Sequence, residues 1–338
     1  MNLRDRLIDC LERREVDKVP ALSVTQTATV ELMRMTGAEW PEAHSDPEKM
    51  VKLALSGHEI AGLEGVRYPF CLTILAEALG CEINMGAMDI QPSIASNPYS
   101  GTSEIPEVPD DLVDRGRIPV MLEVTELLKK EVVGNVPIIA GLVGPATLTA
   151  HLMGTSNFLI GFLKNPEYVK KFLDFSTEVC IKHANNLLEH GADVVCIPDG
   201  IAGPDLIDPD MFESFIKPKY QKFCRDVKGI KISHMCGDID AILEPLSRCG
   251  FEGISVEEKI TNLRAAKEIL GGRSKLIGNV SASGTMLMHS YDDVKIEARG
   301  CLEEGVDVLA PGCGIAPDTP LKNIKSLVDA RDEYYQKG

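Results

Sequence analysis

Apolar residues follow two alternating patterns along this chain: amphipathic stretches that end at a glycine, and short β-branched runs that come directly after them. Residues 187–191 lead in this way into the run 192–197, and residues 301–305 lead into 306–310. Glycine after the last helical residue permits a left-handed turn. A continuous apolar run then suits a parallel strand that is buried on both faces. The pattern predicts repeated helix–strand units around a parallel sheet.

Eight apolar runs qualify as buried strands, and helical stretches separate them. The strands are predicted at 19–25, 64–68, 137–143, 192–198, 229–234, 252–257, 275–279 and 306–311. The clearest helices are predicted at 166–190, 209–227, 238–249 and 319–336. Eight alternating units in 338 residues predict an α/β fold of the (β/α)₈ TIM-barrel type. An open doubly wound sheet is the alternative interpretation.

One segment departs from this alternation. Residues 70–118 fit the alternation least well, and their Pro, Gly and Ser content predicts a long irregular insertion over the barrel mouth. Near the N-terminus, a first helix is predicted from the four-residue spacing of Leu3, Leu7 and Leu11. No linker is evident, so residues 1–338 are expected to form a single barrel domain.

Composition and charge exclude several functions. The net charge of −16 argues against nucleic-acid binding, because a nucleic-acid partner needs a wide basic face. No apolar stretch approaches the roughly 18 residues of a membrane span, and the charged N-terminus lacks the apolar core of a signal peptide. A cytoplasmic protein that does not bind membranes is expected, with its ten cysteines present as reduced thiols.

Three soft metal ligands are predicted to meet at the barrel mouth. His234 and Cys236 are two residues apart at the end of one predicted strand, so their side chains share a face. Cys313 follows the last predicted strand, and barrel active sites lie at the carboxyl ends of strands. One imidazole and two thiolates suit zinc with a fourth, exchangeable position. Cys313 on a Gly-flanked turn could instead be a nucleophile, which would leave the other two residues unexplained.

The ligand set indicates a kind of chemistry. Zinc deprotonates a thiol that enters its coordination shell, and sulfur ligands leave that thiolate nucleophilic. Zinc hydrolases more often use histidine and carboxylate ligands, so thiol alkylation is favoured over hydrolysis. Further strand-end residues are candidates for substrate binding, although loop hydrogen bonds are the alternative; they are Arg67, Gln26, Asp199 and Asn279. A guanidinium at Arg67 suits a sulfonate or another anion.

Several longer motifs resemble a known family. The chain is similar to the methylcobamide:coenzyme M methyltransferases of methanogenic archaea, within the uroporphyrinogen decarboxylase superfamily. The resemblance covers nearly the whole chain and is strongest towards the methanol-pathway type, although the methylamine-pathway paralogue shares several motifs. The motifs are 234–238, 309–317, 23–27, 40–44, 80–86, 255–259 and 278–281.

The resemblance implies a zinc-bearing barrel with His234, Cys236 and Cys313 as ligands. It maps a fourth ligand onto Glu257, with Glu258 as the competing position. The implied reaction moves a methyl group from a methylcobamide, carried by a corrinoid protein, to the thiol of coenzyme M, giving methyl-coenzyme M in methanogenesis from methanol. The methylamine-pathway reaction and a corrinoid-binding protein with structural zinc are the alternatives. Porphyrinogen decarboxylation is disfavoured, because residues 22–29 lack the arginines that would hold the substrate carboxylates.

Overall fold

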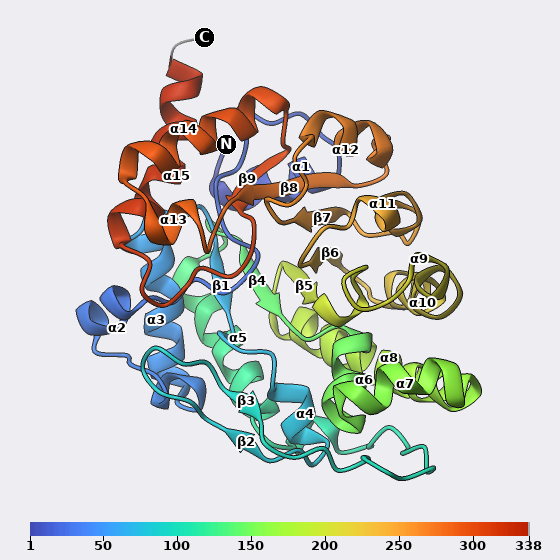
Figure 1. Cartoon of the computed structure of the whole chain (residues 1–338). Coiled ribbons are helices and arrows are strands. Elements are labelled where there is room, and N and C mark those ends of the chain that lie inside the picture. Colours follow the sequence, from blue (N-terminus) through green and yellow to red (C-terminus); the bar gives the residue numbers. More distant parts are fainter. Residues whose placement is uncertain (337–338) are drawn as a thin grey trace.

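The computed structural model describes residues 1–336 and places seven parallel strands inside a ring of helices (Figure 1). The strand order is β1-β4-β5-β6-β7-β8-β9, so each strand pairs with the next one along the chain. The strands are β1 (Val66–Tyr68), β4 (Ile138–Gly141), β5 (Val194–Pro198), β6 (Ile230–Met235), β7 (Gly253–Val256), β8 (Lys275–Val280) and β9 (Val308–Pro311). The predicted α/β fold with a parallel sheet is therefore confirmed.

The first predicted strand, 19–25, is present only as a short bridge between β9 and β1. Ala21 pairs in parallel with Leu309, whose backbone bonds flank it on both sides. On the other side, the amide of Glu64 donates to the Ala21 carbonyl at 2.9 Å, just before β1 begins. Beyond this bridge the backbone turns away, because the Ser23 hydroxyl bonds the amide and carbonyl of Thr25. The bridge joins the two edges of the sheet, which excludes the open doubly wound alternative.

Helices and shorter turns cover the outside of the strands. The predicted helix 166–190 is observed with these bounds, whereas the predicted helix 209–227 is interrupted by a π-helical turn at Phe212–Ile216 (η4). The helices are α1 (Leu3–Leu11), α2 (Val30–Thr36), α3 (Pro47–Glu59), α4 (Ile74–Ala78), α5 (Ile118–Val132), α6 (Pro145–Met153), α7 (Thr155–Lys164), α8 (Pro166–His190), α9 (Pro209–Met211), α10 (Lys217–Asp226), α11 (Asp240–Ser247), α12 (Leu263–Leu270), α13 (Thr285–Met288), α14 (Tyr291–Glu304) and α15 (Leu321–Gln336), with 3-10 turns η1 (Glu42–His44), η2 (Leu112–Asp114) and η3 (Gly200–Ala202). None of the helices within residues 1–336 is long and apolar enough to cross a membrane.

Two apolar cores hold the fold together. The larger core lies between the strands and the surrounding helices. The smaller core fills the barrel interior, where alternate strand residues meet Leu7, Cys10 and Leu11 of α1. Because α1 packs against these interior residues, it covers the end of the barrel at which the strands begin. The helix α1 therefore does not cover the carboxyl end of the barrel, which is the end where barrel proteins carry their functional sites.

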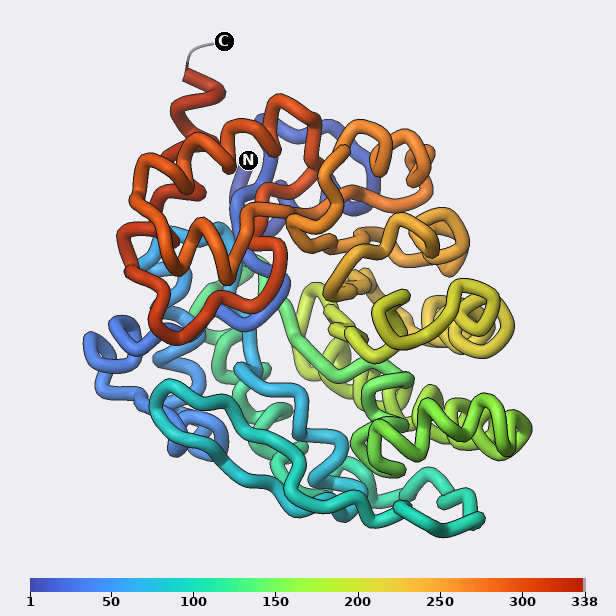
Figure 2. The backbone as a smooth tube through the Cα atoms, viewed as in Figure 1, coloured from blue at the N-terminus to red at the C-terminus, as the bar shows by residue number. Residues whose placement is uncertain are grey.

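A buried ionic cluster ties the two ends of the chain together. Glu64, just before β1, accepts from Arg331 of α15 at 2.6 and 2.8 Å and from Arg6 of α1 at 2.8 Å. All three side chains are buried. In Figure 2 the first, blue segment of the backbone and the red segment near its other end lie in the same sector of the barrel. The cluster therefore holds α1 and α15 against the start of β1, where the barrel closes.

Residues 69–117 connect β1 to α5 over the carboxyl end of the barrel. The segment contains α4 and a small antiparallel pair, β2 (Ile83–Asn84) and β3 (Ser93–Ile94). The turn between them places Gln91 in the wall of a cavity at the barrel mouth. This long connection thus contributes to the wall of that cavity.

Candidate metal centre

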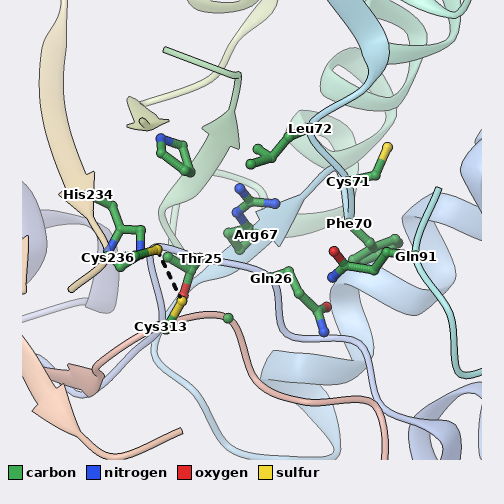
Figure 3. Close-up of a pocket in the computed structure, with 12 residues that line it drawn as sticks. Thr25, Gln26, Arg67, Phe70, Cys71, Leu72, Gln91, His234, Cys236 and Cys313 are labelled. Carbon is green, nitrogen blue, oxygen red and sulfur yellow. Dashed lines mark hydrogen bonds between the residues drawn. The ribbon is translucent and has the colours of Figure 1, made fainter. Parts of the chain in front are cut away.

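A cavity of about 140 Å³ lies at the carboxyl ends of the strands (Figure 3). Its walls combine polar, sulfur-bearing and apolar side chains from four connections of the barrel and from β1, β5 and β6. The lining residues are Thr25, Gln26, Arg67, Phe70, Cys71, Leu72, Gln91, Pro198, His234, Cys236, Cys313 and Gly314. Such a volume accommodates a small molecule with few heavy atoms.

The three predicted soft ligands meet on one wall of this cavity. His234 belongs to β6, Cys236 follows the last residue of that strand, and Cys313 comes shortly after β9. The Cys236 sulfur lies 3.5 Å from Nε2 of His234 and 3.7 Å from the Cys313 sulfur. One ligand atom from each residue falls within 4.8 Å of the others. The fold therefore brings together an imidazole and two thiols in a group that one cation can bridge.

The orientation of the imidazole is set by the neighbouring strand. Ser255 of β7 stands opposite His234 in the parallel register, and its Oγ lies 3.0 Å from Nδ1 of the ring. A hydrogen bond at Nδ1 leaves Nε2 directed towards the sulfur atoms. Partners of this kind fix the ring and the tautomer of metal-binding histidines. Ser255 is not recognisable from the sequence as a site residue, because its role follows only from the pairing of the two strands.

The two neighbouring thiols suit a bound cation. The hydrogen bond from Cys236 lowers the pKa of the Cys313 thiol below its usual value although burial acts the other way, and the nearby imidazole adds to the lowering. The same hydrogen bond and burial raise the pKa of Cys236 far above its usual value. Two adjacent thiolates repel each other, so without a cation the pair retains a proton. A divalent cation removes this penalty, and the donor set fits Zn²⁺.

The two glutamates after β7 point in different directions. Oε2 of Glu257 accepts from the Gly237 amide at 2.8 Å, beside Cys236. Burial raises the pKa of Glu257, and the charge of Cys313 adds to this rise. Glu258 instead accepts from the Ser281 hydroxyl at 2.8 Å. Glu257 is thus the glutamate beside the sulfur cluster, although its oxygens do not join the compact group of three ligand atoms.

Arg67 is a buried cation that faces the same cavity. Its Nε donates to the Val24 carbonyl at 3.3 Å, and Nη1 donates to the carbonyl of Pro69. Only 2% of the residue is exposed, and burial lowers the pKa of the guanidinium. No carboxylate within residues 1–336 lies at ion-pair distance from it. A buried guanidinium without a counter-ion is well placed to receive an anionic group from the cavity.

Gln26 also lines the cavity, and its amide holds two loops together. The side chain donates to the carbonyls of Ala28 and Ile315 and accepts from the Ala28 amide at 2.6 Å. Ile315 comes two residues after Cys313, so Gln26 positions the loop that carries this cysteine. The side-chain nitrogen and oxygen of Gln26 are thus already hydrogen-bonded to the protein backbone.

Asp199 and Asn279 do not line the cavity. The Asp199 carboxylate is fully buried and accepts from the amide of Thr147 at 2.6 Å and from the Tyr220 hydroxyl at 2.9 Å. It thereby satisfies the amino end of α6. Asn279 donates to the carbonyls of Glu257 and Ile260, each at 2.9 Å. The positions of both side chains fit roles in holding the strand-end loops.

The loop between β1 and α5 supplies cavity residues that the sequence analysis did not identify. Phe70, Leu72 and Gln91 line the cavity opposite the sulfur cluster in Figure 3. They come from a segment without regular period, so no pattern predicts which of its residues turn inward.

Comparisons with known proteins agree with this geometry. The sequence profile of the family described as uroporphyrinogen decarboxylase (URO-D) matches residues 2–334. The methylcobamide:CoM methyltransferase MtaA of Methanosarcina barkeri is 50% identical, with 98% of each chain covered. The methylcobamide:CoM methyltransferase MtbA of Methanosarcina acetivorans is 32% identical, again with 98% of each covered.

A solved structure shows the same fold. A methyltransferase from Methanosarcina mazei superimposes with a TM-score of 0.98 at 50% identity, covering 99% of each chain. The chain therefore belongs to the uroporphyrinogen decarboxylase (URO-D) family and, within it, to the methylcobamide:CoM methyltransferases.

Proposed function

We propose that this chain transfers the methyl group of a methylated corrinoid to the thiol of coenzyme M, producing methyl-coenzyme M in methanogenesis from methanol. The observation that carries the proposal is the sharing of one small cavity by His234, Cys236 and Cys313 and by the unpaired guanidinium of Arg67. Coenzyme M is itself bifunctional, because it has a thiol at one end and a sulfonate at the other. The cavity offers a partner for each end.

The metal of this proposal is Zn²⁺, held by His234, Cys236 and Cys313. Bound Zn²⁺ would act as a Lewis acid that ionises an incoming thiol and keeps its sulfur in place. The protein's own residues prepare the site for this task. Ser255 fixes the imidazole, and Gln26 fixes the loop of Cys313. Glu257 is the proposed fourth ligand, because its carboxylate stands beside Cys236. It would either yield its place to an incoming thiol or remain as a further ligand.

Arg67 is proposed to hold the sulfonate. A guanidinium offers several N–H donors in one plane, which matches the oxygens of an anionic group. Burial strengthens this interaction, since no water competes with the anion. The apolar side chains of Phe70 and Leu72 border the same cavity and exclude water from the space between the two ends of the substrate.

The methanol pathway is preferred over the methylamine pathway by similarity. Identity to the relative named MtaA is 50%, whereas identity to the relative named MtbA is 32%. We place the reaction in the cytoplasm, where the ten cysteines, all free in the structure, stay reduced. The methyl donor is proposed to arrive on a corrinoid protein.

The proposal is tested by an anaerobic assay in which methylcobalamin and coenzyme M are mixed with the protein and the cobalamin spectrum is followed. Native protein should consume methylcobalamin only when the thiol is present. Zinc-stripped protein should be inactive, and added zinc should restore the rate. Cys313→Ala should lose both zinc and activity, while Cys224→Ala, which changes a cysteine of α10 outside the cavity, should keep both.

The same samples separate this function from a corrinoid-binding protein with structural zinc. A structural metal contributes its binding free energy to folding, so its removal lowers stability. We expect zinc-stripped protein to unfold at nearly the native urea concentration while its turnover is lost. Loss of the fold together with the metal, without any turnover by the native protein, would support the structural alternative.

A further inference from the structure

The net charge of the chain is concentrated on one face. The connections that follow the barrel strands contain 19 Asp and Glu residues but only 5 Lys and Arg residues, a net charge of −14. The rest of the chain contains 32 acidic and 30 basic residues. We call these connections the mouth loops; they are 22–46, 69–117, 142–165, 199–208, 236–239, 257–262, 281–290 and 312–320.

Such an asymmetry is more than a general device for solubility. A soluble protein that merely avoids association can spread its charge over the whole surface. Here the body of the barrel is almost neutral and the face around the cavity is strongly acidic. In Figure 1 the loop bearing β2 and β3 and the loop bearing α13 lie on this face. A uniform acidic composition does not explain a gradient of this kind.

Large apolar side chains are exposed among these acidic loops. Ile90, Leu206 and Met288 are 59%, 45% and 73% exposed and belong to three different mouth loops. Ile90 is the neighbour of Gln91, which lines the cavity. Exposed apolar residues within a charged rim are typical of protein–protein contact surfaces.

The size of the cavity indicates what must sit on this face. A volume of about 140 Å³ accepts a small thiol but not a corrin macrocycle. If the proposed function is correct, the corrinoid therefore stays outside the cavity, and its cobalt approaches from the mouth. The protein that carries the corrinoid must then rest on the mouth loops during methyl transfer.

We propose that the mouth loops form an electrostatic docking surface for a corrinoid-carrying protein that presents lysine and arginine side chains around its corrinoid. This inference rests on the proposed function and adds the charge of the partner's contact face. Complementary charge would steer the two proteins into register and raise the rate of encounter. The exposed apolar residues would supply the short-range contacts once the faces meet.

The test compares two methyl donors with the full-length protein. One donor is the methylated corrinoid protein purified from the cells that make this chain, and the other is free methylcobalamin. From 50 to 300 mM KCl, kcat/KM for the protein donor should fall about tenfold, as screening weakens steering. With free methylcobalamin it should change less than about twofold, since one small donor makes few charged contacts with the rim.

A charge-reversal variant tests whether the mouth loops cause the salt dependence of kcat/KM. Glu42, Asp89 and Asp318 are exposed residues of three mouth loops outside the cavity wall. The variant E42K/D89K/D318K should lose about tenfold in kcat/KM with the protein donor at 50 mM KCl and lose most of its salt dependence. Its rate with free methylcobalamin should stay native. The matched control E15K/E131K/E268K changes three exposed acids at the other end of the barrel and should behave as the native protein does with both donors.

Two results would overturn the inference: an unchanged rate and salt slope in E42K/D89K/D318K, or equal losses in both triple variants. Failure of the proposed function would look different, because native protein would then not demethylate free methylcobalamin at all. In that case a sedimentation titration of the corrinoid protein against the two triple variants still decides whether the mouth loops are a docking surface.

Discussion

At the scale of single residues, the site depends on side chains that hold other side chains. Ser255 orients His234 through a 3.0 Å contact, and Gln26 fixes the loop that carries Cys313. The sequence analysis identified the three ligands, because their spacing follows from strand geometry. It could not identify Ser255, because that contact depends on the register between β6 and β7.

Ser255→Ala is expected to weaken zinc binding about tenfold, because a lost partner at Nδ1 frees the ring to rotate and to change tautomer. Ser255→Thr keeps the hydroxyl and should retain most of the affinity. Competition with a chromogenic chelator measures both values. Native zinc affinity in the alanine variant would show that the hydroxyl does not position the ring.

Arg67→Gln is expected to raise KM for coenzyme M about 10-fold to 100-fold, because hydrogen bonds to a charged group contribute about 1.5–3 kcal/mol. Ethanethiol, which lacks the sulfonate, serves as the control substrate. Its kcat/KM should be nearly the same in the native protein and the variant. An equal loss with both thiols would mean that Arg67 supports the fold of the cavity and does not recognise the sulfonate.

At the scale of elements, a helix or strand is predicted well where strong local signals mark its ends. Helix α8 occupies its predicted residues because Asn165 caps its start and Gly191 ends it. The first strand was predicted too long, because Ser23 and Thr25 satisfy the local backbone with their hydroxyls. The inward turn of Gln91 could not be predicted, since the loop from β1 to α5 has no period.

Glu64→Gln is expected to lower the free energy of unfolding by about 2–3 kcal/mol, because Arg6 and Arg331 lose the buried carboxylate that they share and keep only the more exposed Asp17 and Asp332. Urea denaturation measures the loss, and Glu59→Gln, on the exposed surface of α3, is the matched control. A loss below about 1 kcal/mol, typical of surface pairs, would contradict the role assigned to this cluster.

The same carboxylate gives stability a defined pH dependence. Burial opposes its ionisation, but the hydrogen bonds and charge of Arg331 outweigh burial and lower the pKa of Glu64 below its usual 4.5. Its contribution is therefore complete above the unfolded-state pKa and is lost as the pH falls through the folded value. Native protein should lose more stability than Glu64→Gln between about pH 5 and pH 3, because the carboxylate takes up its proton in this range.

At the scale of the whole molecule, the prediction that residues 1–338 form a single domain calls for one cooperative transition. Trp40 is the only tryptophan and is buried near Phe70, with ring centroids 6.1 Å apart. Its fluorescence therefore reports on the mouth side, while circular dichroism reports on all helices. The two thermal unfolding curves should coincide. A fluorescence transition several degrees below the other would show that the segment 70–118 unfolds on its own.

The most direct test of the account is zinc-edge X-ray absorption of the native protein with and without coenzyme M. The central claim is that the thiol joins a zinc ion already held by His234, Cys236 and Cys313. The account predicts two sulfur neighbours at about 2.3 Å before the thiol is added and three afterwards. A spectrum with fewer than two sulfurs, or one that does not change with coenzyme M, would contradict it.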